Sequence, residues 1–169
     1  IADTLNFKSP TTTDQDRAMA RHWSDFTGIN IEELAESIFK ASSQNFLDDL
    51  PSLLEGDVKE YMVQDRKIII SQRNLYRLNE TEGIQNALEE VMEQKAKDKD
   101  AYLWIMMFTT ARDNGSIFYA AGPGKEIVSE VFPNKEGESH TFQPGVVSRK
   151  NQVVPKIFLY LREGGFYRA

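Results

Sequence analysis

The sequence predicts an α/β fold: a mixed sheet of about five strands with helices on both faces, preceded by a helical hairpin. Residues 101–109 are apolar almost without interruption, which is typical of a central strand covered on both faces. In several other segments, apolar residues recur at helical spacing. Shorter strand-like segments lie between those segments, and this order is typical of the α/β class.

The first two elements are predicted to be helices joined by a tight Gly-Ile-Asn turn. Thr13 and Asp16 have the spacing of a capping box at the start of the first helix. Gly28 can end that helix in a left-handed conformation. Asn30, with Glu33, is placed to cap the second helix, which has an apolar face. The hairpin should therefore form at the amino-terminal side of the sheet.

The sheet region is predicted from alternating strand and helix signals. The expected elements are a hairpin of strands at 58–63 and 67–73, a helix capped by Asn79 with Glu82, the strand at 101–109, its partner at 116–121, and a short helix from the glycine-rich turn at 122–124 through Phe132. Residues 133–143 should be a polar loop, and residues 1–13 a strand end followed by an irregular linker.

Composition and charge exclude several classes of function. The net charge of −6 provides no overall basic field to hold nucleic acid, so an anion site needs locally clustered cations. The absence of cysteine excludes disulfides, thiolate metal sites and cysteine nucleophiles. No apolar run approaches the roughly 20 residues of a membrane span. We therefore expect a cytoplasmic protein with neither nucleic acid nor membrane as partner. A chain that begins at Ile1 is expected to be a fragment or a processed piece.

The stretch at residues 145–155 is the strongest candidate site. It reads as a strand end at residues 146–147, a polar corner and then a helix. Because Pro155 has no N–H to lose in a first helical turn, the helix is predicted to start just after Lys150. Arg149 and Lys150 would then lie beside free N–H groups at a helix N-terminus, where phosphate can bind. A solvated turn with two surface cations is the alternative.

This stretch, Gly-Val-Val-Ser-Arg-Lys-Asn-Gln-Val-Val-Pro, resembles the C-terminal signature of family II, manganese-dependent inorganic pyrophosphatases. It departs from that signature at Asn151, where the family usually has a second lysine. Residues 3–11 resemble the segment that closes the family's N-terminal Asp-His-His (DHH) domain, and residues 38–41 fit the family's helix-ending lysine. The resemblance thus spans nearly the whole chain. It implies the end of the DHH domain and a linker at residues 1–12, and a C-terminal substrate-binding domain at residues 13–169.

The resemblance also implies roles for individual residues. Lys40, Arg149 and Lys150 would bind the phosphoryl groups of pyrophosphate or phosphate, and Asp3 would ligate metal together with the DHH domain. That cofactor would be manganese, or cobalt or magnesium, in the intact enzyme, which is expected to be a homodimer through the DHH lobe. The chain lacks an Asp-His-His motif and has only two histidines, which we interpret as structural or surface residues. By itself it should therefore bind no metal and hydrolyse no pyrophosphate.

Two other functions stay open at this point. The same domain could belong to an exopolyphosphatase of the superfamily, which a preference for long chains in the intact parent would reveal. It could also be a stand-alone anion-binding or interaction module without catalysis. A DHH-type phosphodiesterase is disfavoured, because the triple-glycine nucleic-acid loop of those enzymes is not found in the sequence. The sequence does not show whether the parent carries an upstream regulatory domain, or what Asn151 changes.

Overall fold

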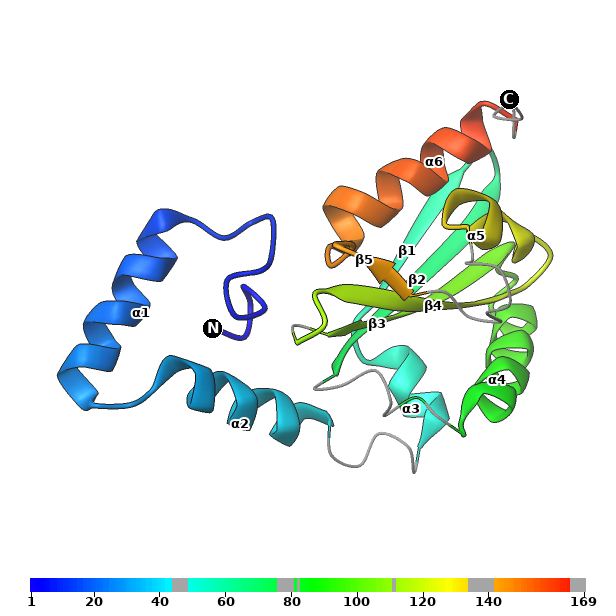
Figure 1. The fold of residues 1–169 in the computed structure, drawn as a ribbon. Coiled ribbons are helices and arrows are strands. Elements are labelled where there is room, and N and C mark those ends of the chain that lie inside the picture. Colours follow the sequence, from blue (N-terminus) through cyan, green and yellow to red (C-terminus); the bar gives the residue numbers. More distant parts are fainter. Residues whose placement is uncertain (44–48, 76–80, 82, 111, 134–141, 165–169) are drawn as a thin grey trace.

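The computed structural model describes residues 1–43, 49–75, 81, 83–110, 112–133 and 142–164 (Figure 1). Helices α1 (Asp14–Thr27) and α2 (Ile31–Ser43) form the predicted hairpin, which lies with the amino terminus to the left of the sheet in Figure 1. Thr13 and Asp16 make both hydrogen bonds of the capping box, and Gly28 ends α1 with φ 72°. The prediction of this hairpin is confirmed.

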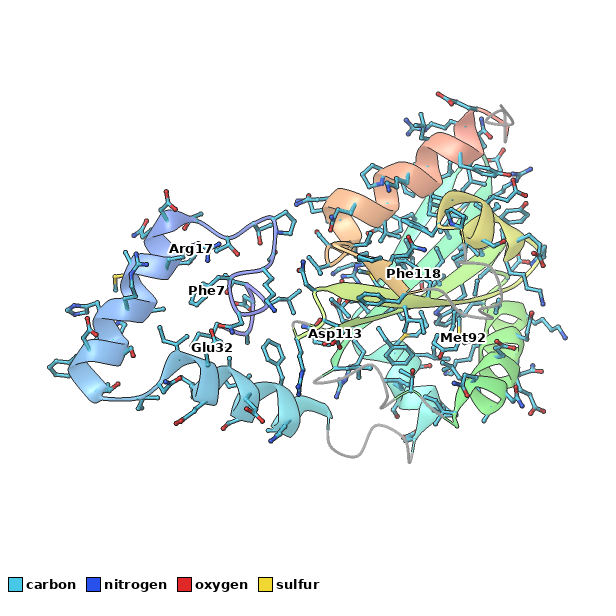
Figure 2. All side chains as sticks on the ribbon, in the orientation of Figure 1. Phe7, Arg17, Glu32, Met92, Asp113 and Phe118 are labelled. Atoms are coloured by element: carbon cyan, nitrogen blue, oxygen red, sulfur yellow. The ribbon has the colours of Figure 1, made fainter. Side chains whose placement is uncertain are left out.

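The segment before α1 is not a strand end. Residues 2–11 form successive turns, and Leu5, Asn6 and Phe7 all have positive φ angles, of 50°, 51° and 65°. An extended strand requires negative φ, so the strand part of that prediction is wrong. Side chains of the hairpin hold these turns: Arg17 donates to the Phe7 carbonyl at 2.9 Å, and Asn6 donates to Glu32 at 2.8 Å (Figure 2).

The hairpin buries only part of its apolar surface. Ala35 and Phe39 of α2 pack with Leu5 and with Val147, far along the chain, in a small separate core. Helix α1 contains no buried residue, and the side chain of Phe26 is 76% exposed. The apolar side chains Met19, Trp23 and Phe26 of α1 are therefore exposed within the described residues.

Among the described residues, the sheet has five strands in the order of the chain: β1 (Val58–Val63), β2 (Arg66–Leu75), β3 (Leu103–Thr110), β4 (Gly115–Ala121) and β5 (Phe142–Pro144). Only the pair β2–β3 is parallel. A parallel pair needs a crossover connection, and α4 (Gln85–Asp98) lies in it. The predicted mixed sheet is thus confirmed, and β1 matches its predicted bounds.

Helices cover both faces of the sheet, as predicted. Helices α3 (Leu50–Glu55) and α4 lie below the sheet in Figure 1, and α5 (Glu126–Val131) and α6 (Val154–Arg162) lie above it. All eight residues of β3 are buried. Its alternate side chains pack in opposite cores, with Trp104 toward α4 and Ile105 toward α6. This burial explains why its sequence is continuously apolar.

Two predicted details are wrong, and a third lies outside the described residues. The cap by Asn79 and Glu82 lies outside the described residues, and α4 begins at Gln85 without a side-chain cap. The end of the predicted polar loop at 133–143 is wrong, because β5 begins at Phe142. The strand end predicted at residues 146–147 is also wrong, because β5 ends at Pro144.

The glycine-rich turn before α5 is structural, as predicted. Gly122 has φ 89°, and a Cβ there would lie 2.9 Å from the carbonyl oxygen of Tyr102. The Gly122 N–H donates to Glu93 of α4 at 3.1 Å, and Glu93 also accepts from Lys125 at 2.9 Å. Because a carboxylate already occupies this N–H group, the turn is no phosphate loop.

Ser71 fastens α3 to the sheet, and its removal should destabilise the fold. Its buried hydroxyl donates to the Leu54 carbonyl at 2.6 Å and accepts from the indole of Trp104 at 3.0 Å. Ser71→Ala leaves two buried polar groups without partners, so we expect a loss of about 1–3 kcal/mol in unfolding free energy, measured with urea. Ser129→Ala, at an exposed helical serine, should change it by less than about 0.5 kcal/mol. Equal effects would contradict the role of Ser71.

Glu93 should contribute to stability in a pH-dependent way. The hydrogen bond from Lys125, followed by that from the Gly122 N–H, holds the pKa of Glu93 below its ordinary value. This contribution is present above the unfolded pKa of glutamate and is lost as pH falls through the lower folded pKa. Since both partners are partly exposed, Glu93→Gln should cost less than about 1 kcal/mol at pH 7. Urea unfolding of both proteins should show that difference shrinking in acid; a constant difference would contradict the assignment.

Candidate functional site

Residues 145–148, called the corner below, connect β5 to the final helix. The side-chain oxygen of Gln152 accepts from the N–H groups of Val147 and Ser148, both at 2.9 Å, and its amide nitrogen donates to the Gly145 carbonyl at 2.7 Å. One side chain thus closes the corner from within. Because these backbone groups bond to a side chain, residues 146–147 cannot pair as the strand that the sequence suggested.

A chain of polar side chains, buried at Ser116 and Thr109 and half-buried at Gln72, fastens the corner to the sheet. Ser116 donates to the Val146 carbonyl at 2.6 Å and shares a hydrogen bond of 2.9 Å with Thr109. Gln72 donates to Thr109 at 3.0 Å and to the Val147 carbonyl at 3.4 Å. Ser116 and Thr109 are fully buried, and each of their hydroxyls is bonded. The corner is therefore fixed to the carboxyl ends of β2 and β3 and to the start of β4.

The helix after the corner starts earlier than predicted. A π-helical turn spans Arg149–Val153, with the Ser148 hydroxyl accepting from the Asn151 N–H at 3.3 Å, and α6 follows from Val154. Pro155 has no N–H to donate and its ring excludes the carbonyl four residues before it, so the first turn widens. The predicted start after Lys150 is wrong, and both cations lie within the first turn.

Arg149 is held tightly by the sheet. Its Nη1 donates to the carbonyl oxygens of Asp57 at 2.7 Å and of Ile70 at 3.2 Å, and its Nη2 donates to Asp57 Oδ1 at 2.8 Å. The Arg149 side chain is 11% exposed. Lys150, in contrast, is exposed. The two neighbouring cations therefore differ, because Arg149 is anchored by the sheet and Lys150 is exposed to solvent.

An open cavity of about 510 Å³ lies between the corner, the carboxyl end of β2, α2 and the amino-terminal turns. Its polar lining residues are Asp3, Ser9, Thr11, Asp57, Gln72, Arg73, Asn74, Ser148, Arg149 and Lys150. Three cations face two carboxylates there, in a chain of net charge −6. The formal charge of the lining is therefore +1, in contrast to the net negative charge of the whole chain, which favours an anionic ligand.

The structure brings together three of the four residues that the sequence suggested. Asp3, Arg149 and Lys150 all line the cavity. Lys40 does not, although the preceding residues Ile38 and Phe39 do; its ammonium pairs with Glu36 at 2.7 Å on the surface of α2. The proposed role of Lys40 therefore rests on the resemblance alone.

Four lining residues were not singled out from the sequence: Asp57, Gln72, Arg73 and Asn74. The last three interrupt an apolar strand with consecutive polar residues, at the carboxyl end of a parallel pair. Ligands commonly bind at that edge of an α/β sheet, so this polar run is the feature of the sequence that could have indicated these lining residues. The Asn74 side-chain oxygen is buried and has no hydrogen-bond partner among the described residues, which leaves an acceptor for a ligand or water in the cavity.

The described residues contain neither a cluster of metal ligands nor a membrane-spanning helix. No group of three or more His, Asp or Glu side chains that could hold a metal ion occurs in that part of the chain. None of its helices has the length and apolarity to cross a bilayer. His22 is exposed on α1 and makes an edge-to-face contact with Trp23, as expected for a surface residue, and His140 lies outside the described residues.

Known proteins are similar in sequence to nearly the whole of this chain. The chain is 34% identical over 157 residues to the cobalt-dependent inorganic pyrophosphatase of Clostridium perfringens, covering 93% of the chain and 29% of that protein. It is 32% identical over 155 residues to the manganese-dependent inorganic pyrophosphatase of Bacillus subtilis, covering 92% of the chain and 50% of that protein. The chain therefore spans about half the length of such relatives or less.

A solved structure has the same fold. The crystal structure of a Methanococcus jannaschii protein assigned to the family II inorganic pyrophosphatases matches with a TM-score of 0.76 and 31% identity, over 95% of this chain and 52% of that one. The sequence model of the DHHA2 domain family matches residues 36–158, which is well over half of the chain. The resemblance to the C-terminal part of these pyrophosphatases is confirmed, and the chain belongs to the DHHA2 domain family.

Proposed function

We propose that this chain is the substrate-binding half of an inorganic pyrophosphatase, which hydrolyses diphosphate to two phosphates. The observation that carries the proposal is the cavity at which Arg149 and Lys150 meet Asp3 beside a rigid corner. Its positive lining suits a polyanion. The relatives from Clostridium perfringens and Bacillus subtilis are inorganic pyrophosphatases by name, which supports pyrophosphate as the anion.

The two cations would have different tasks. Cleavage of a phosphoanhydride bond by water requires that negative charge on the phosphoryl oxygens be neutralised as the bond breaks. Arg149, held by Asp57 and Ile70, offers a fixed planar fork to two phosphoryl oxygens. Lys150 is exposed and can follow the moving charge. Because the corner is fixed in advance, little reorganisation accompanies the reaction.

The metal would be shared with another lobe. The relatives are manganese- or cobalt-dependent by name. Asp3 supplies a carboxylate oxygen of the hard type that manganese accepts, and its exposure leaves that oxygen accessible. A single carboxylate makes no site, so the other ligands would come from a DHH lobe. When bound, the metal would supply an activated water and clamp the phosphoryl oxygens.

Several finer points stay predictions. We place the end of the DHH lobe and the linker at residues 1–12 and the substrate-binding domain at residues 13–169; the DHHA2 match itself starts at residue 36. Lys40 as a third phosphate ligand, a homodimer through the DHH lobe and a cytoplasmic location also stay predictions. The linker would serve as the hinge on which the two lobes open and close.

Pyrophosphate hydrolysis with manganese tests the proposal, in the native polypeptide that contains this chain and in the 169-residue chain by itself. The native polypeptide should be active and the 169-residue chain inactive. Arg149→Ala should lower kcat of the native polypeptide about 100-fold, because a preorganised charge contact is lost. Lys156→Ala is the matched control: it removes an exposed cation on α6, six residues beyond Lys150, and kcat should not change.

Three results would contradict this proposal. Activity of the 169-residue chain would place the metal ligands within it. Full activity after Arg149→Ala would show that Arg149 is not part of the substrate site. Hydrolysis of long polyphosphate in preference to pyrophosphate would instead identify an exopolyphosphatase.

A further inference from the structure

The guanidinium group of Arg149 is only partly used within the chain. An arginine carries five N–H donors. Both donors of Nη1 go to carbonyl oxygens, of Asp57 and Ile70, and one donor of Nη2 goes to Asp57 Oδ1. Within the part of the chain that the structure describes, the Nε–H and the second Nη2–H make no hydrogen bond. These two donors belong to adjacent nitrogens of the planar fork.

That unused pair matches the way in which arginine binds phosphate. Two parallel N–H groups of one guanidinium can contact two oxygens of one phosphoryl group. Arg149 lines the cavity while its side chain is only 11% exposed. Protein atoms thus surround most of the side chain. A ligand in the cavity would contact the Nε–H and Nη2–H donors that the protein does not use.

Asp57 supplies two of the three acceptors, and the sheet fixes it in place. It precedes β1, and its carbonyl oxygen accepts from the Gln72 N–H at 2.9 Å as well as from Arg149. Its carboxylate is the acceptor that holds Nη2. The Asp57 carboxylate therefore sets the orientation of the guanidinium plane. The carbonyl oxygens of Asp57 and Ile70 set how far the guanidinium group reaches into the protein.

We propose that Asp57 is a positioning residue for pyrophosphate hydrolysis: its carboxylate orients Arg149 so that the Nε and Nη2 donors face the cavity. The proposal rests on the proposed function, because it assigns Arg149 to the substrate. Asp57 itself does not touch the substrate, and its charge would repel a phosphate. Its contribution acts through Arg149 and should vanish when Arg149 is removed.

A double-mutant cycle in the native polypeptide tests this dependence, with pyrophosphate and manganese as reagents. Asp57→Ala should lower kcat/KM roughly 10- to 100-fold, as expected when a catalytic group loses its support. In the Arg149→Ala background the same change should alter kcat/KM less than about twofold, because the two residues act as one unit. Asp57→Asn keeps an oxygen acceptor for Nη2 and should recover part of the loss.

The matched control is Glu60→Ala, which removes an exposed carboxylate three residues further along β1 and away from the cavity. It should leave kcat/KM unchanged. Thermal unfolding shows whether each variant folds, and Asp57→Asn carries the test if Asp57→Ala does not. Equal losses from the Asp57 change in both Arg149 backgrounds would overturn the proposal, as would unchanged or higher kcat/KM in both Asp57 variants. Full activity of Arg149→Ala alone would instead contradict the proposed function.

Discussion

The site depends on how the backbone of residues 145–148 is satisfied without a strand partner. Gln152 closes the corner from inside, and Ser116 and Gln72 bind its carbonyl groups from the sheet. An unpaired backbone group buried here would cost about 1–3 kcal/mol, so a looser corner would be unstable as well as imprecise. Because these hydrogen bonds fix the corner, Arg149, the residue that follows it, is placed to bind Asp57 directly before β1.

The fold was largely predictable because its signals are local or periodic. A nearly continuous apolar run predicted the buried strand β3. The Thr13 cap and Gly28 predicted the start and the end of the first helix. The errors lie where tertiary contacts override local preference. Residues 146–147 have strand-like side chains, yet the Gln152 amide takes their hydrogen bonds. At residues 2–11, positive φ angles held by contacts with the hairpin replace the expected extended chain.

The site was predictable only in part. Arg149, Lys150 and Asp3 were predicted through the resemblance to a known family, because a bare pair of surface cations carries little information; all three line the cavity. Asp57 was not singled out, because it pairs with Arg149, a residue 92 positions away, and no local pattern encodes such a contact. The polar run at the end of β2 was visible in the sequence, but its meaning depended on knowing that β2 and β3 run parallel.

Val146 and Val147 are adjacent, yet their side chains belong to different cores. Val146 packs in the large core under α5 and α6, and Val147 packs with Leu5, Ala35 and Phe39 of the amino-terminal part. A single peptide bond thus joins two packed bodies, directly before Ser148 and Arg149. A tilt of the hairpin relative to the sheet would change the backbone torsion angles around that bond, which lies two residues before Arg149 and three before Lys150.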